Sequence, residues 1–216
     1  MLPLKFGSLG RPPAVLCLGA HCDDIEIGCG GTLVRWAAEY PGATFHWAVF
    51  AGDALRQQES RAAAAHLLPG ERGPQLRFFQ FRDSFFPAQA EQIKEAFEEL
   101  KVALQPDVIL THHLADRHQD HALLANLTWN TFRSHLILEY EIPKYEGDLG
   151  HPNVYVPLAR GDLDRKVRAL IESFGSQRSR AWFTEDTFCA LARLRGLECA
   201  APSGFAEAFH ARKVCL

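Results

Sequence analysis

The sequence predicts an α/β fold in which a doubly wound, mostly parallel sheet carries helices on both faces. Short apolar runs alternate with amphipathic stretches four times over residues 14–133. The first run, AVLCLGA at 14–20, is apolar at nearly every position, so both of its faces are expected to be buried, as in a parallel strand. Strands that alternate with helices in this way are typical of parallel strands joined by crossover helices.

The four strand–helix units account for most of the first 133 residues. The expected strands are 14–20, 44–51, 76–81 and 107–112. The expected helices are 25–40, 56–68, 88–104 and 121–133. The third helix has the clearest pattern, because its apolar side chains recur at helical spacing with acids and lysines opposite; they are Ile93, Phe97, Leu100 and Leu104.

Beyond residue 134 the pattern is less regular. Two further strands are expected at 135–142 and 153–158, and the Gly/Pro/acid-rich loop between them is placed to border a pocket. Helices are expected at 163–174 and over TEDTFCALARLRGLE, while 206–214 fits either a strand or a short helix. No low-complexity linker, repeat or composition shift interrupts the chain, so we expect one domain over residues 1–216.

Composition excludes several classes of protein. The net charge of −3, with ten histidines counted as neutral, gives no general attraction to nucleic acid or anionic lipid. The six cysteines form no CxxC pair, so we expect mostly reduced thiols rather than a disulfide scaffold. The N-terminus lacks the apolar region of a signal peptide, and no segment approaches the ~18 apolar residues of a membrane span. We therefore expect a cytoplasmic protein.

Acids and imidazoles follow two of the expected strands. GAHCDDIEIGCGGTL (19–33) comes directly after the first strand, and THHLADRHQDH (111–121) overlaps the end of the fourth. Because the carboxyl ends of parallel strands meet at one edge of a sheet, the two clusters can face each other if their strands are neighbours. Imidazole and carboxylate together suit zinc or iron(II), and three protein ligands would leave a position open for water.

Local spacing suggests how each cluster divides its roles. Asp23 and Asp24 are adjacent, so their side chains cannot both point equally well at one ion, and we expect one ligand and one base. In the second cluster, Asp120 and His121 have the pattern of a helix N-cap and first turn. His118 would then lie just outside the helix, free for another role.

These segments resemble a known family. AHCDDIEIGCGGTL is similar to the AHPDDxExGxGGT motif of the LmbE-like, PIG-L-type N-acetylglucosaminyl deacetylases, and DRHQDH is similar to their HxDH motif. The order of the motifs and their separation of about a hundred residues also match. RQQE at 56–59 and RGLECAAPSGFAEAF at 195–209 resemble further family segments, so the likeness extends over most of the chain. The family's Rossmann-like α/β fold agrees with the strand–helix alternation.

The resemblance implies a metal-dependent hydrolase. His21, Asp24 and His121 take the positions of the family's metal ligands, and the metal is usually zinc, with iron(II) or another divalent ion as an alternative. Asp23 takes the position of the general base. The implied reaction removes the N-acetyl group of an amino sugar or glycoconjugate and releases acetate and a free amine.

The resemblance also implies supporting residues. His118 takes the position of the imidazole that stabilises the oxyanion, and Asp120 that of its orienting partner. Arg56 and Asp83 occupy family positions near the sugar, and we expect them to contact substrate. Apart from the resemblance, the glycines within the first motif are expected to permit close packing of helix on strand; they are Gly28, Gly30 and Gly31.

Two residues depart from the family pattern. Cys22 stands where the family usually has proline, and Gln119 replaces a proline often found in the second motif. A thiol beside a cation can become a thiolate and compete as a ligand. It can equally point into the core as a small apolar residue, and we favour this second interpretation for Cys22.

Functions other than the deacetylation of an amino sugar make different demands on the sequence. A non-sugar amide could serve as substrate in place of an amino sugar. A nucleotide-binding Rossmann module would need glycines in the first strand–helix turn, where Asp23 and Asp24 would instead repel phosphate. A metallophosphoesterase would need more bridging acids and a GNH[DE] segment that we do not find. The loop at 140–153 is expected to select the substrate, and the sequence leaves homo-oligomerisation open.

Overall fold

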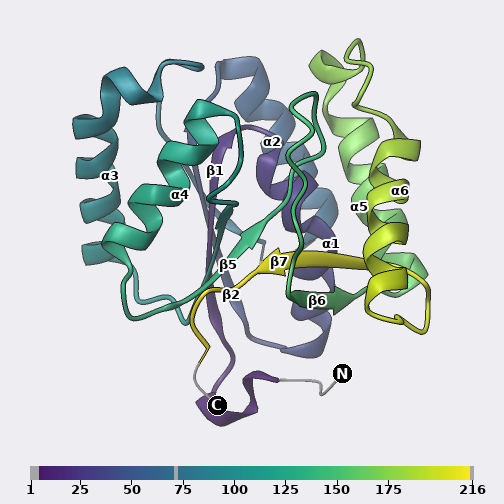
Figure 1. Cartoon of the computed structure of the whole chain (residues 1–216). Coiled ribbons are helices and arrows are strands. Elements are labelled where there is room, and N and C mark those ends of the chain that lie inside the picture. Colours follow the sequence, from purple (N-terminus) through teal and green to yellow (C-terminus); the bar gives the residue numbers. More distant parts are fainter. Residues whose placement is uncertain (1–4, 71–72, 215–216) are drawn as a thin grey trace.

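Seven strands form one sheet in the order β3-β2-β1-β4-β5-β7-β6 in the computed structural model, which describes residues 5–70 and 73–214 (Figure 1). Strands β1 to β5 pair in parallel, and only β7 runs antiparallel to its two neighbours, β5 and β6. The predicted, mostly parallel α/β sheet is therefore confirmed. The strands are β1 (Ala14–His21), β2 (Thr44–Ala51), β3 (Gln75–Phe78), β4 (Val108–His112), β5 (Leu136–Tyr140), β6 (Val154–Pro157) and β7 (Ala206–His210).

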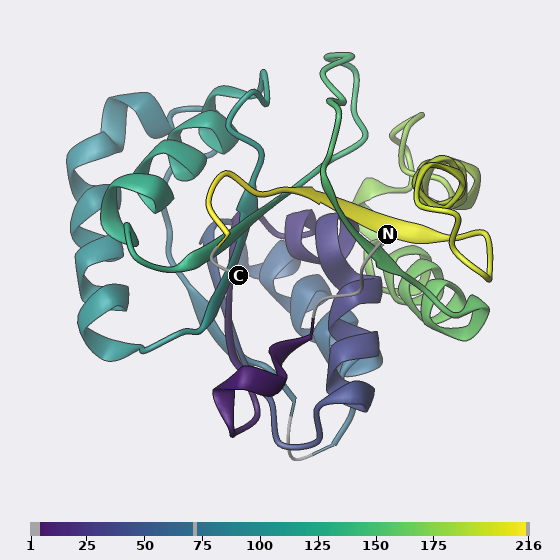
Figure 2. The same ribbon diagram turned by 60° about the horizontal axis from the view of Figure 1, so that its bottom comes forward.

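Helices cover both faces of the sheet. Helices α1, α2 and α5 pack together on one face, α3 and α4 cover the other, and α6 contacts α5 and β7 (Figures 1 and 2). The helices are α1 (Asp24–Glu39), α2 (Ala54–Leu67), α3 (Ala90–Ala103), α4 (Gln119–Thr131), α5 (Arg160–Ser173) and α6 (Glu185–Glu198). Within the described part of the chain, three short 3₁₀ helices lie at Phe6–Leu9, Phe86–Gln89 and Gly175–Gln177.

The central strand β1 explains why its sequence is apolar throughout. Val15 and Cys17 belong to the hydrophobic core beneath α1, α2 and α5. Leu16 and Leu18 belong to the core on the opposite face, beneath α3 and α4. Successive side chains of a strand point to opposite faces, so a strand covered on both sides needs apolar residues at every position.

Helix α1 lies unusually close to the sheet. A Cβ atom at Gly28 would come within 2.3–2.9 Å of the Tyr140 ring, and one at Gly31 within 2.6 Å of Leu158. These contacts are too close for a side chain, so the predicted role in close packing is confirmed for Gly28 and Gly31. It is not confirmed for Gly30, where a Cβ atom would make ordinary contacts of 3.4–3.5 Å. The close approach fixes the start of α1 relative to the end of β1.

The structure settles or corrects several predicted boundaries. The segment expected to be either strand or helix at 206–214 forms the strand β7. The third strand ends at Phe78 rather than at residue 81, although the N–H groups of Phe79 and Phe81 still donate to carbonyl oxygens of β2. Among the described residues, no helix combines the length and the apolar character needed to cross a membrane.

Candidate functional site

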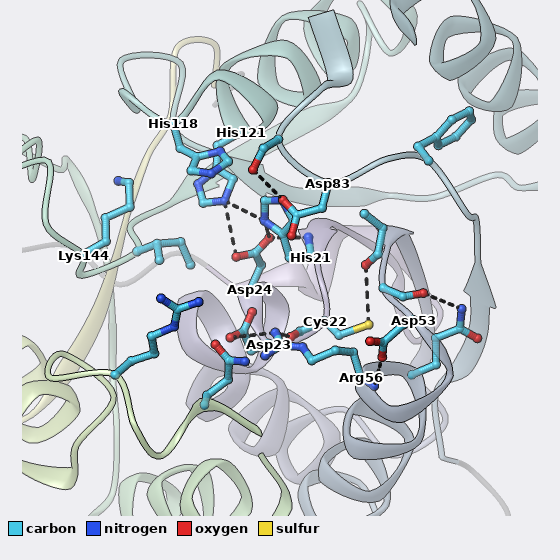
Figure 3. Close-up of a pocket in the computed structure, with 18 of the residues that line it drawn as sticks. His21, Cys22, Asp23, Asp24, Asp53, Arg56, Asp83, His118, His121 and Lys144 are labelled. Atoms are coloured by element: carbon cyan, nitrogen blue, oxygen red, sulfur yellow. Dashed lines mark hydrogen bonds and ion pairs between the residues drawn. The ribbon is translucent and has the colours of Figure 1, made fainter. Parts of the chain in front are cut away.

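The two polar motifs meet at one edge of the sheet. Strand β1 ends at His21 and its parallel neighbour β4 ends at His112, as the sequence predicted for adjacent strands. The order of the strands reverses between β1 and β4, and crevices at such points bind ligands in doubly wound sheets. A cavity of about 850 Å³ opens there, and its walls include residues of both motifs (Figure 3).

Two imidazole nitrogens and the two oxygens of one carboxylate converge among the residues that line this cavity. His21 Nδ1 lies 3.3 Å from His121 Nε2 and 3.5 Å from Asp24 Oδ2, and His121 Nε2 lies 3.5 Å from Asp24 Oδ1. The side chains point toward one another in Figure 3. A tetrahedral zinc ion with bonds of about 2.0–2.1 Å would hold its ligands roughly 3.3–3.4 Å apart. The spacing of this His/Asp cluster therefore fits a divalent metal ion.

Each of the two imidazoles has a carboxylate on its other ring nitrogen. His21 Nε2 lies 3.1 Å from Asp120 Oδ2, and His121 Nδ1 lies 2.9 Å from Asp116 Oδ2. Metal-binding histidines typically donate their second N–H to a carboxylate, which fixes the tautomer and orients the ring. Asp116 belongs to the second motif, but sequence reasoning gave it no role. The sequence offered one clue to this role, namely that Asp116 stands five residues before the proposed ligand His121.

Burial and neighbouring charges shift the pKa values of all three proposed metal ligands. Burial lowers the pKa of His121 to about 4, so its ring is neutral near pH 7. Burial would raise the pKa of Asp24, but the nearby imidazoles, chiefly His121 and His112, outweigh it and hold this pKa well below its usual range. Burial would likewise lower the pKa of His21, yet hydrogen bonds to Asp120 and other acids raise it well above its usual range.

Asp23 occupies a strained position beside the cluster. It lies between β1 and α1 with a φ of 136°, a conformation that residues with side chains rarely adopt and that clusters at functional sites. Its side chain is buried, and Oδ2 lies 3.0 Å from Arg56 Nη2. Burial raises the pKa of Asp23 to about 7, although the Arg56 guanidinium opposes this shift.

His118 directly precedes α4, and its side chain lines the cavity. His118 Nδ1 accepts a hydrogen bond of 3.3 Å from the backbone N–H of Asp120. In the neutral ring the proton is then on Nε2, which can donate to a ligand. The N-cap of α4 is therefore His118, and the helix begins at Gln119. The predicted N-cap at Asp120 was wrong, because the imidazole accepts the backbone N–H two residues later.

The carboxylate of Asp120 has partners other than those expected. It accepts backbone hydrogen bonds from Ser84 (2.6 Å) and Phe86 (3.1 Å), and it contacts His21. Its ligand oxygen lies within 4.8 Å of a ring nitrogen of His118, but it is the backbone of Asp120 that bonds to that ring. A role for Asp120 in orienting His118 stays a prediction.

The two expected substrate contacts both line the cavity. The Arg56 guanidinium pairs with Asp23 and also bonds to the hydroxyl of Ser176 and the carbonyl of Cys22. The Asp83 side chain is 69% exposed, and its Oδ1 lies 3.2 Å from His21 Nε2. The hydrogen bond to His21 holds the pKa of Asp83 well below its usual range. Contact of either residue with a substrate stays a prediction.

Cys22 and His112 are built into the protein interior. The thiol of Cys22 is fully buried in the hydrophobic core, 3.6 Å from the carbonyl oxygen of Ala51, and burial raises its pKa. A buried thiol agrees with the packing role that we favour for Cys22, and its lack of a role as a metal ligand stays a prediction. His112 Nε2 accepts a 3.0 Å hydrogen bond from the backbone N–H of Ala20, and its ring stacks on that of His121 at 3.9 Å. The buried His112 ring therefore packs against the proposed ligand His121 and helps to hold it in place.

The outer walls of the cavity come from segments far apart in the sequence. One wall is the loop between β5 and β6, which was expected to select the substrate. Its lining residues are Ile142, Lys144, Tyr145 and Glu146. Another part of the wall comes from the segment between α5 and α6, namely Gln177, Arg180 and Trp182. Both segments contribute polar and aromatic groups to the cavity.

The chain is similar to several known proteins in sequence or in fold. A deacetylase of Escherichia coli K12, named YaiS and described as uncharacterized, is 33% identical over 149 residues, which are 64% of this chain and 78% of YaiS. The crystal structure of GalB, a 4-carboxy-2-hydroxymuconate hydratase from Pseudomonas putida KT2440, superposes with a TM-score of 0.75 at 18% identity, covering 94% of this chain and 98% of GalB. At that identity the likeness shows a shared fold.

A deacetylase structure has the same fold. The N,N′-diacetylchitobiose deacetylase of Pyrococcus horikoshii superposes with a TM-score of 0.69 at 18% identity, covering 96% of this chain and 86% of that one. The family model described as PIG-L, GlcNAc-PI de-N-acetylase, matches residues 16–132, a span that contains both polar motifs. This match covers more than half of the chain, so the chain belongs to the PIG-L family of deacetylases.

Proposed function

We propose that this protein is a zinc-dependent hydrolase that removes the N-acetyl group of an amino sugar or glycoconjugate. The observation that carries the proposal is the cluster of His21 Nδ1, Asp24 and His121 Nε2, at separations of 3.3–3.5 Å, beside the strained Asp23 in the cavity. The products would be acetate and a free amine.

Zinc suits the donor set, because two imidazoles and a carboxylate are a common ligand set of catalytic zinc sites. The carboxylate partners on the outer nitrogens of His21 and His121 support coordination by these rings. A divalent ion held there would polarise the acetamide carbonyl and lower the pKa of a bound water from about 15.7 towards 7. Iron(II) would suit the same ligands.

Asp23 is the proposed general base. Its carboxylate would take a proton from the attacking water and later return it to the leaving amine, which must be protonated to depart. The ion pair with Arg56 at 3.0 Å orients the carboxylate. The backbone of Asp23, with its φ of 136°, is strained in the way that is common at functional sites. Arg56 would thereby act through Asp23 in addition to any contact with substrate.

His118 is the proposed oxyanion donor. Because its Nδ1 accepts the N–H of Asp120, its Nε2–H is available to the carbonyl oxygen of the substrate. A fixed donor aimed at developing negative charge is worth about 10²–10³ in rate in other hydrolases. His118 therefore need not carry a positive charge to contribute.

The substrate class is supported by the family and by the cavity. The family description names a GlcNAc derivative, and the P. horikoshii relative is a deacetylase of N,N′-diacetylchitobiose. A cavity of about 850 Å³ has room for a sugar and part of its aglycone. Aromatic and amide groups on the walls suit the faces and hydroxyl groups of a sugar ring.

The test is a screen for amine and acetate release. Protein reconstituted with zinc is offered N-acetylated glycosides, N-acetylated amino acids and an unsaturated hydroxy acid. We expect turnover of an N-acetyl glycoside that vanishes in His21→Ala. Asp23→Asn should lower kcat by at least about 10²-fold while zinc content is retained. Asp164→Asn, an exposed carboxylate on α5, is the matched control and should retain wild-type activity.

Each failure has a distinct meaning. Unchanged turnover in Asp23→Asn would remove it from the base role. Acetate release confined to N-acetylated amino acids would move the function to non-sugar amides. Hydration of the unsaturated acid without any amide cleavage would contradict a deacetylase. A purified protein that binds nucleotide and holds no stoichiometric metal would contradict the hydrolase itself.

A further inference from the structure

The loop from Glu141 to Gly150, here called the wall loop, is closed at its neck by one buried arginine. Arg195 donates to both carboxylate oxygens of Glu141, at 2.6 and 2.8 Å, and to the carbonyl oxygen of Gly150 at 3.1 Å. The N–H of Gly150 also donates to Glu141 at 3.3 Å. The two ends of the wall loop are therefore held together, and its middle lines the cavity.

Lys144 anchors the middle of the wall loop. Its side chain is only 8% exposed, although it lines the cavity. The ammonium group lies 2.7 and 2.8 Å from the carboxylate oxygens of Asp148, within the loop, and 3.0 Å from Asp116 Oδ2, outside it. Asp148 in turn accepts the backbone N–H of Arg117 at 2.7 Å. The loop is thus fastened to the segment that precedes α4.

Asp116 links this anchor to the metal-binding cluster. The oxygen that contacts Lys144, Oδ2, also lies 2.9 Å from His121 Nδ1. The other oxygen accepts the backbone N–H of His118 at 2.8 Å. Lys144, Asp116 and His121 therefore form a continuous chain of polar contacts from the substrate wall to a proposed metal ligand.

A lysine facing a cavity is usually taken for a substrate contact, but Lys144 already has two carboxylate partners. Removing one partner of a buried ion pair is strongly unfavourable, so this lysine is held in place. Its neighbour Tyr145 is 70% exposed and lines the cavity, so a displacement of Lys144 would move a substrate wall. The same displacement would leave Asp116 without a cation beside His121.

We propose that Lys144 is a positioning residue that couples the wall loop to the metal ligand His121 through Asp116. The proposal rests on the proposed function only in assuming that His121 binds a metal ion. Coupling of this kind is reciprocal: metal bound by His121 stabilises the wall loop, and an ordered wall loop strengthens metal binding.

The experiment compares metal-free wild type with Lys144→Met, which keeps the aliphatic stem and removes the charge. Zinc affinity is measured by competition with a chelator, and hydrogen exchange of peptides from 141–150 is followed with and without zinc. In wild type, zinc should slow exchange in the wall loop. In Lys144→Met, the zinc dissociation constant should rise about 10-fold, as for other partners of ligating histidines, and zinc should no longer slow this exchange.

The control is Lys166→Met. Lys166 is as deeply buried as Lys144, but it pairs with Glu207 away from the cavity. Its loss should destabilise the fold, because Glu207 is left buried without its cation, but the folded variant should keep the zinc affinity of wild type and the response of the wall loop to zinc. If Lys144→Met does not fold, Asp148→Asn removes one of the two carboxylates of Lys144 and should shift both readouts in the same direction by a smaller amount.

The outcomes separate this inference from the proposed function. Wild type that binds no zinc contradicts the proposed function and, with it, the coupling. Wild type and Lys144→Met with equal zinc affinity, or with equal slowing of loop exchange by zinc, overturn the coupling while leaving the deacetylase proposal intact. A change in exchange at 141–150 without any change in zinc affinity also overturns it, since coupling must act in both directions.

Discussion

Two buried clusters of charged side chains in this protein are built differently. Beneath α1, Glu207 accepts hydrogen bonds from the Lys166 ammonium at 2.6 Å and from the backbone N–H groups of Gly31 and Thr32 at 2.9 and 2.6 Å. Glu207 thus pairs with a lysine and accepts hydrogen bonds from three donors. At the strand ends, by contrast, the ion-pair partners of Asp24 among the described residues are all imidazoles.

The difference separates a cluster that stabilises the fold from a cluster that can take part in a reaction. Imidazoles supply positive charge only by taking up protons, and no lysine or arginine among the described residues pairs with Asp24, in contrast to Asp116, which pairs with Lys144. The Lys166–Glu207 pair, in contrast, needs no additional cation. We call Lys166 and Glu207 the matched cluster, and Asp24 with its imidazole partners the unmatched cluster. We infer that the matched cluster holds α1 against the sheet, whereas the unmatched cluster binds a ligand.

The largest expected effect comes from breaking the unmatched cluster. Asp24→Asn removes the carboxylate shared by both imidazoles and should lower kcat/KM by at least about 10³-fold, because the several kcal/mol supplied by a bound ion are lost. Zinc at 100 times the dissociation constant should stabilise wild type by about 2.7 kcal/mol and should not stabilise this variant. Thermal unfolding with and without zinc, together with the deacetylase assay, measures both; a normal zinc response in Asp24→Asn would remove it from the ligand set.

Breaking the matched cluster should act on folding instead. Glu207→Gln leaves the Lys166 ammonium buried without a carboxylate and should lower the free energy of unfolding by about 3–5 kcal/mol. Activity per folded molecule should be unchanged. Glu99→Gln, which breaks the exposed pair with Arg77, is the control and should change stability by less than about 1 kcal/mol. Equal destabilisation by the two variants in denaturant titrations would contradict the distinction.

A third effect depends on pH. Burial lowers the pKa of His210 to about 4, with His113 nearby adding to the shift, Arg195 and His151 acting in the same direction and Glu139 opposing. The folded protein therefore binds fewer protons than the unfolded chain between about pH 6.5 and pH 4, and stability is lost as the pH falls through that window. His210→Gln should lose about 1–2 kcal/mol less than wild type between pH 7.5 and pH 4.5, after allowance for partial exposure.

Chemical denaturation at the two pH values measures this difference. The comparison contains its own control, because both proteins lose the same carboxylate interactions on acidification. An identical loss of stability in wild type and His210→Gln would show that His210 does not resist protonation.

The smallest effect is expected at Cys22, which lies next to the unmatched cluster but belongs to the core. Cys22→Ala should cost about 1 kcal/mol of stability and leave zinc affinity unchanged. The chelator competition assay decides between a packing residue and a ligand. A clear loss of zinc affinity in Cys22→Ala would mean that the thiol coordinates the metal.

The strand–helix units could be predicted because local patterns encode them. The apolar run 14–20 and the spacing of Ile93 and Phe97 are independent of distant contacts. The antiparallel placement of β7 between β5 and β6 could not be predicted, because strand order depends on tertiary packing. The helix start at Gln119 was missed because an imidazole caps it in place of the expected aspartate.

The site followed the same division. His21, Asp23, Asp24 and His121 stand in recognisable motifs at strand ends, and the structure brings them together. Lys144 stands in an irregular loop, and only the folded chain places it beside Asp116 and Asp148. A residue that acts on a metal ligand through another side chain, as we propose for Lys144, is therefore hard to recognise from the local sequence.

Anomalous diffraction at the zinc edge, from crystals of zinc-loaded protein, tests the central claim most directly. We expect one zinc ion per chain, bound by the imidazoles of His21 and His121 and the carboxylate of Asp24. Zinc located elsewhere, or bound by only one of these two imidazoles, would contradict the account.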